Sequence, residues 1–200
     1  KLRFRVIKRS GGLYFIMLHK NKESITLKKD HKDAHIALVV SLFNREFTEL
    51  LEKKCIDTLV KSGIARNHIT VVQVPGAYEI PLACQRCAQS KKYSAIIVLG
   101  AIIKGDTYHF ELVANECARG VMAVMLKYDV PIIFEVLAGK REDIIKRAND
   151  DEYNKGNEAA RAAIQVLNTN NLTKCFINSK HEIRNSKQIQ NSNDQTSKPF

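Results

Sequence analysis

The chain has 200 residues with a hydrophobic fraction of 44%, which suits one domain with a substantial core. Its net charge of +11 comes mostly from the two ends, since residues 1–33 hold ten Lys/Arg against three Asp/Glu and residues 170–200 hold five against two. No apolar run approaches the ~20 residues that span a bilayer, and charge confined to the ends is weak support for nucleic-acid binding, so we expect neither a membrane nor a nucleic-acid partner.

Residues 1–33 are predicted to be a poorly ordered basic extension, in which a short edge strand could form. The apolar stretch at residues 13–18 is short for a secretion signal and no small-residue cleavage pattern follows it, so we expect a cytoplasmic protein. Met17 is preceded by residues 1–16, which we interpret as a fragment or an organellar leader. If residues 1–33 are a leader, a plastid location is an alternative, although the few hydroxyl residues in this segment argue against it.

Apolar strands alternate with amphipathic helices through residues 34–169, which we predict to be the globular domain. The strands are predicted at residues 35–43, 69–74, 94–103 and 130–137. The helices are predicted from Asn44 to Gly63 and at residues 77–90, 107–128, 141–149 and 155–168. The remaining residues, 170–200, are rich in Asn, Ser and Gln, so we predict a disordered polar tail.

Strands that are apolar throughout and are separated by helices indicate a parallel sheet covered on both faces. We therefore predict a three-layer α/β/α sandwich of the flavodoxin-like type, with a central parallel four-stranded sheet and right-handed crossovers. In such sheets, ligands bind beyond the carboxyl ends of the strands. The candidate site residues therefore lie at residues 41–44, 74–79, 103–109 and 134–137.

The chain has five cysteines, which raises the question of a metal or disulfide site. The one CxxC pair, Cys84 and Cys87, falls inside a predicted helix and has no second pair or histidine at ligand spacing. We therefore expect no metal site, and reduced cysteines on helix faces instead.

Gly105, Asp106 and Thr107 stand where the third strand gives way to a helix. Free N–H groups and the positive end of the helix dipole suit a phosphate there, while the alternative is an ordinary N-cap by Asp106 or Thr107. His109 is the one histidine at such a carboxyl-end junction. Near a helix start it is a candidate proton acceptor, or else a residue that packs or caps.

Four further residues have two interpretations each. Phe43 ends the first strand and is either core or a ring that stacks on a heterocycle. Glu79 either accepts hydrogen bonds from hydroxyls or favours the helix dipole. Arg147 and Lys155 either bind phosphate or are solvated surface cations.

Five blocks of the sequence, taken in order, resemble the lumazine synthase (6,7-dimethyl-8-ribityllumazine synthase) family. The blocks are VVSLFN (39–44), VVQVPGAYEIPLA (71–83), VLGAIIKGDTYHFELVANECARGV (98–121), VPIIFEVL (130–137) and NKGNEAARAAI (154–164). The resemblance extends over essentially the whole predicted domain.

The resemblance implies condensation of 5-amino-6-(D-ribitylamino)uracil with 3,4-dihydroxy-2-butanone 4-phosphate in riboflavin biosynthesis. The products are 6,7-dimethyl-8-ribityllumazine, phosphate and water, and the family uses no metal or organic cofactor. It also implies a homopentamer, or multiples of it, with the site between subunits. A non-catalytic homologue that binds lumazine or flavin, or forms a shell, is the alternative.

The resemblance further implies a role for each candidate residue. His109 matches the proton-transfer histidine, Arg147 the phosphate arginine, and Lys155 a lysine close to the substrates. The substrate-binding positions are Phe43, Ala77, Tyr78, Glu79, Ala101, Ile102, Ile103, Gly105, Asp106, Thr107, Phe134 and Glu135.

Phe134 matches an aromatic ring that the neighbouring subunit donates. Glu135 and Ala138 depart from the family, which usually has Gly and Thr at these positions. Residues 147–156 keep the family's length but not its Gly/Ala-rich composition, which leaves the size of the assembly open.

Overall fold

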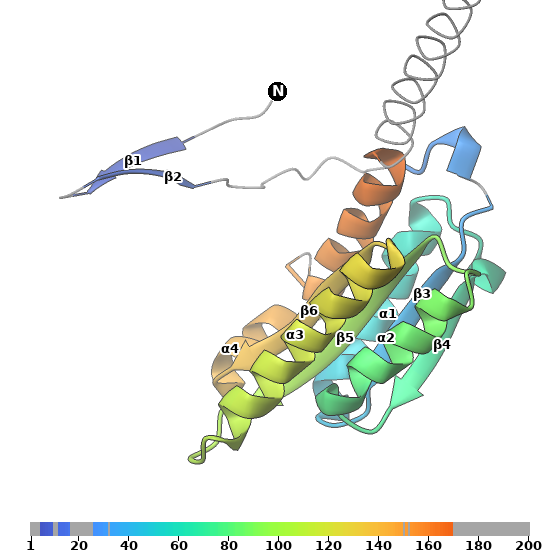
Figure 1. The fold of residues 1–200 in the computed structure, drawn as a ribbon. Helices are drawn as coiled ribbons and strands as arrows, with labels where there is room; N and C mark the ends of the chain where they lie inside the picture. Colours follow the sequence, from blue (N-terminus) through green and yellow to red (C-terminus); the bar gives the residue numbers. More distant parts are fainter. Residues whose placement is uncertain are drawn as a thin grey trace, which may run out of the picture.

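A parallel four-stranded sheet forms the centre of the computed structural model, which describes residues 5–9, 12–16, 26–31, 33–149, 151 and 153–169 (Figure 1). The strands lie in the order β4–β3–β5–β6. Their bounds are β3 Ile36–Ser41, β4 Ile69–Val74, β5 Ala95–Ile103 and β6 Ile132–Gly139. The predicted flavodoxin-like architecture is confirmed, and the observed strands agree with the predicted ones within two residues at each end.

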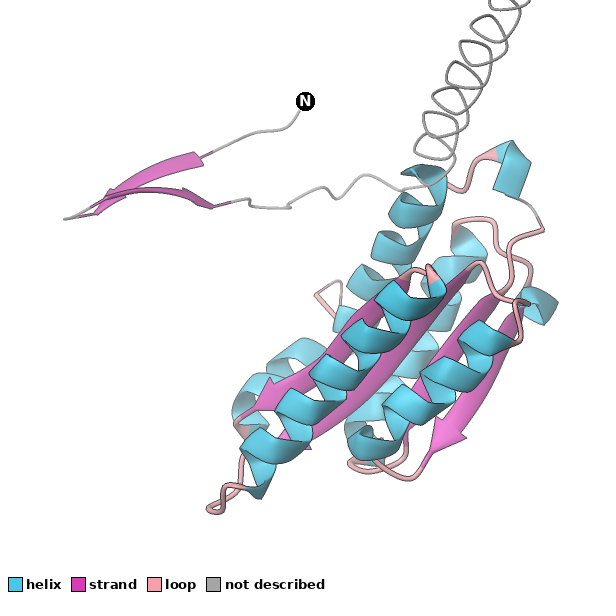
Figure 2. Cartoon of the chain, in the orientation of Figure 1, coloured by secondary structure: helices cyan, strands magenta, loops and turns pink. Residues whose placement is uncertain are grey.

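Helices cover both faces of this sheet (Figure 2). Their bounds are α1 Arg45–Lys61, α2 Ile80–Gln89, α3 His109–Tyr128, α4 Arg141–Ala148 and a further helix over residues 155–169. Short 3-10 turns lie at η1 Lys29–His31, η2 Arg66–His68 and η3 Ala77–Glu79. The predicted helix at residues 77–90 is thus a 3-10 turn followed by α2, with Pro81 in the first turn of α2, where its missing N–H costs nothing.

The core has two halves, one on each face of the sheet. Alternate residues of each strand face opposite sides, so Leu38 and Leu99 pack on one face while Val39 and Val98 pack on the other. The first half lies under α1, α4 and the 155–169 helix, and the second lies under α2 and α3. Burial on both faces explains why the strands are apolar throughout.

Helix α1 illustrates how the sequence pattern produces packing. Phe47, Leu51, Cys55 and Leu59 recur every four residues, and all four are buried against the sheet. Burying a leucine or phenylalanine side chain of this kind contributes roughly 1.5–3 kcal/mol. The helix ends two residues before Gly63, as predicted.

At the start of the chain, β1 Arg5–Arg9 and β2 Gly12–Ile16 pair as an antiparallel hairpin. The sequence had suggested only a short edge strand in this region. Most other residues before 26, and all residues after 169, lie outside the described part of the chain. The predicted disorder of the two ends therefore stays a prediction.

The described cysteines, Cys55, Cys84, Cys87 and Cys117, are free and buried, while Cys175 lies outside the described residues. Burial raises the pKa of the Cys117 thiol to about 11 and also raises the pKa of the other three. In the described part of the chain, no group of three or more His, Cys, Asp or Glu side chains is placed to hold a metal ion. No described helix is both long and apolar enough to cross a bilayer.

Candidate functional site

A cavity of about 330 Å³ lies at the carboxyl edge of the sheet, where β3 and β5 are neighbours. The chain leaves β3 toward β4 on one side and returns to β5 on the other, so this is the switch point at which doubly wound sheets bind ligands. We call it the switch-point cavity. Its lining residues are Phe43, Asn44, Gly76, Ala77, Tyr78, Ala101, Ile102, Ile103, Gly105, Thr107, His109, Phe110 and Val113.

Nine of the candidate residues line this cavity, although they come from four separate segments of the chain. They are Phe43, Ala77, Tyr78, Ala101, Ile102, Ile103, Gly105, Thr107 and His109. The structure thus brings together the ends of β3, β4 and β5 and the start of α3. Asp106 lies between Gly105 and Thr107 in the same loop and is exposed, but it does not line the cavity. The positions of the remaining candidates are described below.

Phe43 is 68% exposed, so the interpretation of this ring as a core residue is wrong. Tyr78, from η3, also lines the cavity and is 62% exposed. Two exposed aromatic rings at the mouth of one cavity offer flat apolar surfaces on which a planar heterocycle can stack.

His109 is the first residue of α3, two residues after the predicted helix start. The side chains of Asp106 and Thr107 do not cap the helix, since α3 has no side-chain cap hydrogen bond. The alternative in which one of them satisfies the first N–H groups is therefore not what the structure shows. This twenty-residue helix directs the positive end of its dipole toward the loop at residues 104–108.

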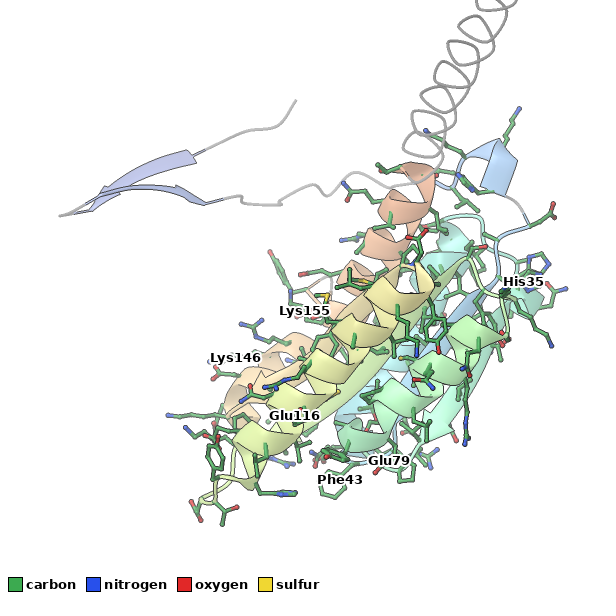
Figure 3. All side chains as sticks on the ribbon, viewed as in Figure 1. His35, Phe43, Glu79, Glu116, Lys146 and Lys155 are labelled. Carbon is green, nitrogen blue, oxygen red and sulfur yellow. The ribbon has the colours of Figure 1, made fainter. Side chains whose placement is uncertain are left out.

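His109 is also set apart from the histidines at the opposite edge of the sheet. His35 and His68 directly precede β3 and β4, and their rings stack with centroids 4.1 Å apart. Figure 3 shows His35 at the far end of the sheet from Phe43. Among the described histidines, His109 is the one that lines the switch-point cavity.

Asn44 joins two strands across the switch point, which sequence reasoning missed. An asparagine before a helix usually caps it through its side chain, but α1 has no such cap. Instead, the Asn44 amide Nδ2 donates to the carbonyl oxygen of Ala101 at 2.8 Å. The residue has a φ of 59°, in the left-handed region that Asn tolerates better than most residues. Its position directly after Phe43 was the available signal.

Replacing Asn44 with glycine is expected to cost about 1 kcal/mol of unfolding free energy, because the bond to Ala101 is lost while the backbone conformation stays allowed. Asn44→Ala is expected to cost roughly 1 kcal/mol more, since its Cβ disfavours a left-handed φ. Urea unfolding of both variants measures the difference. Equal losses would contradict the role given to the backbone conformation.

Glu79 is exposed and does not line the switch-point cavity. It lines a larger cavity of about 510 Å³ between β4 and α2. Its carboxylate nevertheless lies close to Gly76, because a Cβ built on Gly76 would be 3.1 Å from the Glu79 Oε2. Since Gly76 lines the switch-point cavity, the Glu79 carboxylate lies between the two cavities.

Phe134 and Glu135 lie on opposite faces of the sheet, because they are consecutive residues of β6. Phe134 pairs with Val98, which is five residues before the end of β5 at Ile103, or about 16 Å along the strand. Within one chain, Phe134 is therefore far from the carboxyl edge. It is exposed on the edge strand, at 39%.

Glu135 belongs to a second group of candidates, together with Arg147 and Lys155. This group lies on the face of the sheet covered by α1, α4 and the 155–169 helix, away from the α3 face. The charges of Lys155 and Arg147 both act on the Glu135 carboxyl. One chain thus carries two groups of candidate residues that do not meet.

Lys155 is positioned by the buried asparagine that precedes it. The Asn154 side chain is fully buried and donates to the carbonyl oxygens of Ala148 and Asn149, both at 2.9 Å. Its Oδ1 accepts from the Gly156 N–H at 2.7 Å. These bonds fix the backbone on both sides of Lys155, whose side chain is 22% exposed and forms an ion pair with Glu158.

Comparison with known proteins shows which family the sequence matches. The model of the 6,7-dimethyl-8-ribityllumazine synthase family matches residues 33–171. Among solved structures, a GDP-L-fucose synthetase from Naegleria fowleri bound to NADP is similar at 16% identity with a TM-score of 0.37. That match covers 80% of this chain and 48% of the synthetase, so the chain spans about half the length of that protein.

Proposed function

The chain belongs to the 6,7-dimethyl-8-ribityllumazine synthase family, and from this premise we propose that it makes 6,7-dimethyl-8-ribityllumazine. The family associates the chain with riboflavin biosynthesis as a transferase-type enzyme. The proposed reaction joins 5-amino-6-(D-ribitylamino)uracil and 3,4-dihydroxy-2-butanone 4-phosphate, and it releases phosphate and water. The observation that carries the proposal is the switch-point cavity, in which Phe43 and His109 lie together.

The proposed chemistry needs orientation and proton transfer more than it needs a strong nucleophile. An amine attacks a ketone to form a Schiff base, phosphate leaves, and the second amine closes the ring. We assign stacking of the pyrimidine to Phe43 and proton transfer to His109. Holding two substrates in one cavity supplies much of the rate by proximity.

For the phosphate group, we propose the loop at residues 105–107 before α3, together with Arg147 from a second copy of the chain. No side chain caps the start of α3, and the positive end of its dipole favours an anion there. Arg147 is exposed and makes no hydrogen bond or ion pair with any described residue, so its guanidinium is free to bind two phosphate oxygens.

Because Arg147 and Lys155 do not reach the switch-point cavity of their own chain, we propose that a second copy supplies them. Exposed apolar side chains on α2, α3 and β6 support assembly: Leu82, Leu112, Met122, Leu126 and Phe134. We propose a homopentamer or a multiple of it. Native mass spectrometry tests this, and a monomer would leave the candidate site incomplete.

The decisive experiment mixes the protein with both substrates and follows lumazine absorbance. We expect formation well above the slow uncatalysed rate. No acceleration would exclude the enzyme and leave the second candidate function, a homologue that binds lumazine or flavin without turnover. The half-buried Glu135 beside Lys155 is the feature that favours this second function. Ribityllumazine binding without turnover would establish it.

Arg147→Ala is expected to raise the KM for the phosphate-bearing substrate about tenfold or more, because a charge-assisted bidentate contact is lost. The KM for the uracil substrate should change little. Steady-state kinetics with each substrate varied in turn measures both constants. A matched control is Arg141→Ala, which removes an exposed arginine of the same helix that pairs with Glu46 instead. An unchanged KM in Arg147→Ala would contradict the assignment.

A further inference from the structure

Glu135 places a carboxyl group in an otherwise apolar stripe of β6. Its neighbours on the same face are Ile133 and Leu137, both part of the core under α1 and α4, and its partner across the ladder is the fully buried Leu99. Glu135 itself is half-buried and makes no hydrogen bond or ion pair with the residues that the structure describes. An acid in such a place costs free energy when it is ionised.

Charged and titratable groups face Glu135 from each element packed against it. The 155–169 helix contributes Lys155 and Glu158, α4 contributes Arg147, and α1 contributes the Cys55 thiol. The pKa of Glu135 is raised to about 7, because the effect of burial outweighs the opposing charge of Lys155; the Glu158 carboxylate adds to the rise and Arg147 opposes it. The charge of Glu135 therefore changes near neutral pH.

The charge balance of this group depends on Glu135. Lys155 already forms an ion pair with Glu158, while Arg147 forms no ion pair with a described residue and acts on Glu135 only from a longer distance. Among the described residues that act on Glu135, two cations face one carboxylate when Glu135 is neutral, so their summed charge is positive. When Glu135 is ionised, these two cations face two carboxylates and that positive charge is cancelled.

We propose that Glu135 controls the anion affinity of Arg147 and Lys155: its neutral form leaves the pair able to hold a phosphate group, and its ionised form competes with that phosphate for the two cations. Glu135 is in this sense a positioning residue rather than a catalytic one. The identity of the anion as a phosphate-bearing substrate rests on the proposed function, whereas the competition itself follows from the charges of the described residues around Glu135.

Sulfate is the probe for the test, because its charge stays constant over the pH range in which Glu135 titrates. Calorimetry on the full chain in its native assembly measures sulfate affinity at about pH 6 and about pH 8.5, on either side of the Glu135 pKa. For the wild type we expect affinity to fall about tenfold as pH rises, as a unit charge a few ångströms from the anion would cause. Glu135→Gln should keep the low-pH affinity at both values.

Two variants serve as controls in the same measurement. Glu158→Gln removes an exposed acid that pairs with Lys155, so it should raise affinity without removing the pH dependence. Glu142→Gln removes an exposed acid from the first turn of α4, and it should change neither the sulfate affinity nor the pH dependence of that affinity. The proposal would be overturned if sulfate affinity fell equally with pH in Glu135→Gln and in the wild type. It would also be overturned if the wild type bound no sulfate at either pH.

Thermal unfolding supplies a second readout that needs no ligand. Because folding raises the pKa of Glu135, ionising this carboxyl costs more free energy in the folded state than in the unfolded state. The wild type therefore has its full stability at low pH and loses part of it as the pH rises through about 7. Glu135→Gln should therefore match the wild type near pH 4 and exceed its Tm by about 4 °C near pH 8. A constant Tm difference across this range would also overturn the proposal.

These outcomes are distinguishable from failure of the proposed function. If sulfate affinity and Tm behave as expected but no lumazine forms, Glu135 controls an anion site in a protein with another activity. If lumazine forms and Glu135→Gln keeps the wild-type pH dependence of sulfate binding, the enzyme stands and the inference about Glu135 is wrong.

Discussion

Gly156→Ala is expected to destabilise the folded protein by about 3 kcal/mol or more. A Cβ built on Gly156 would lie 2.1 Å from the carbonyl oxygen of Leu51 and 2.9 Å from the Asn154 Oδ1. Neither can move cheaply, because Leu51 is fully buried in α1 and Asn154 is held by its own hydrogen bonds. The midpoint of urea unfolding measures the loss.

Gly139→Ala is the matched control for this substitution, since a Cβ there would meet nothing within 4 Å. We expect its unfolding free energy to stay within about 0.5 kcal/mol of the wild type. If Gly156→Ala were as stable as Gly139→Ala, the close packing of the 155–169 helix on α1 would not have the role that the distances imply. Any folded Gly156→Ala protein should also bind sulfate less well, because Lys155 precedes the displaced residue.

His109→Ala is expected to lower kcat for lumazine formation about 10²–10⁴-fold while changing substrate binding far less. His109 lines the switch-point cavity at the first position of α3, so its imidazole is placed to transfer protons in the proposed reaction. Its side chain is exposed and makes no described hydrogen bond, so the Tm should hardly change. Single-turnover kinetics separates the chemical step from binding.

Two further variants serve as comparisons for His109→Ala. His109→Gln keeps hydrogen-bonding capacity but cannot accept a proton near neutral pH, so it should be nearly as slow as alanine. Tyr108→Phe alters the exposed neighbour, which does not line the cavity, and should retain wild-type kcat. A kcat for His109→Ala equal to that of the wild type would remove the histidine from the proposed mechanism.

The elements of the fold were predictable because their signals are local. Each of the four strands is an apolar run, and each helix repeats apolar residues every three or four positions. The start of α3 was less accurate, since Asp106 and Thr107 are typical capping residues but do not cap it. The burial of Phe43 was also predicted less accurately. An aromatic residue at the end of a buried strand favoured a core position, yet the ring is largely exposed.

The candidate site was predictable in part. That the ends of β3 and β5 and the start of α3 meet at one edge follows from parallel strands and right-handed crossovers. The hydrogen bond from Asn44 to the carbonyl of Ala101 was not predictable, because the two residues are 57 positions apart in sequence. Glu158 escaped notice because nothing in its local sequence distinguishes it from a solvated acid.

By itself, the sequence determined the order of the elements, the architecture of the sheet and the segments that supply the switch-point cavity, because periodicity and chain topology depend on near neighbours. Only the tertiary structure decided that Glu135 shares its surroundings with Arg147 and Lys155 while Phe134 faces the other way. It also decided that the bond between Thr58 and Asn157, 99 residues apart, helps hold the 155–169 helix against α1. Such pairings arise only when distant segments pack together, and that packing is what sets the charge of a buried acid.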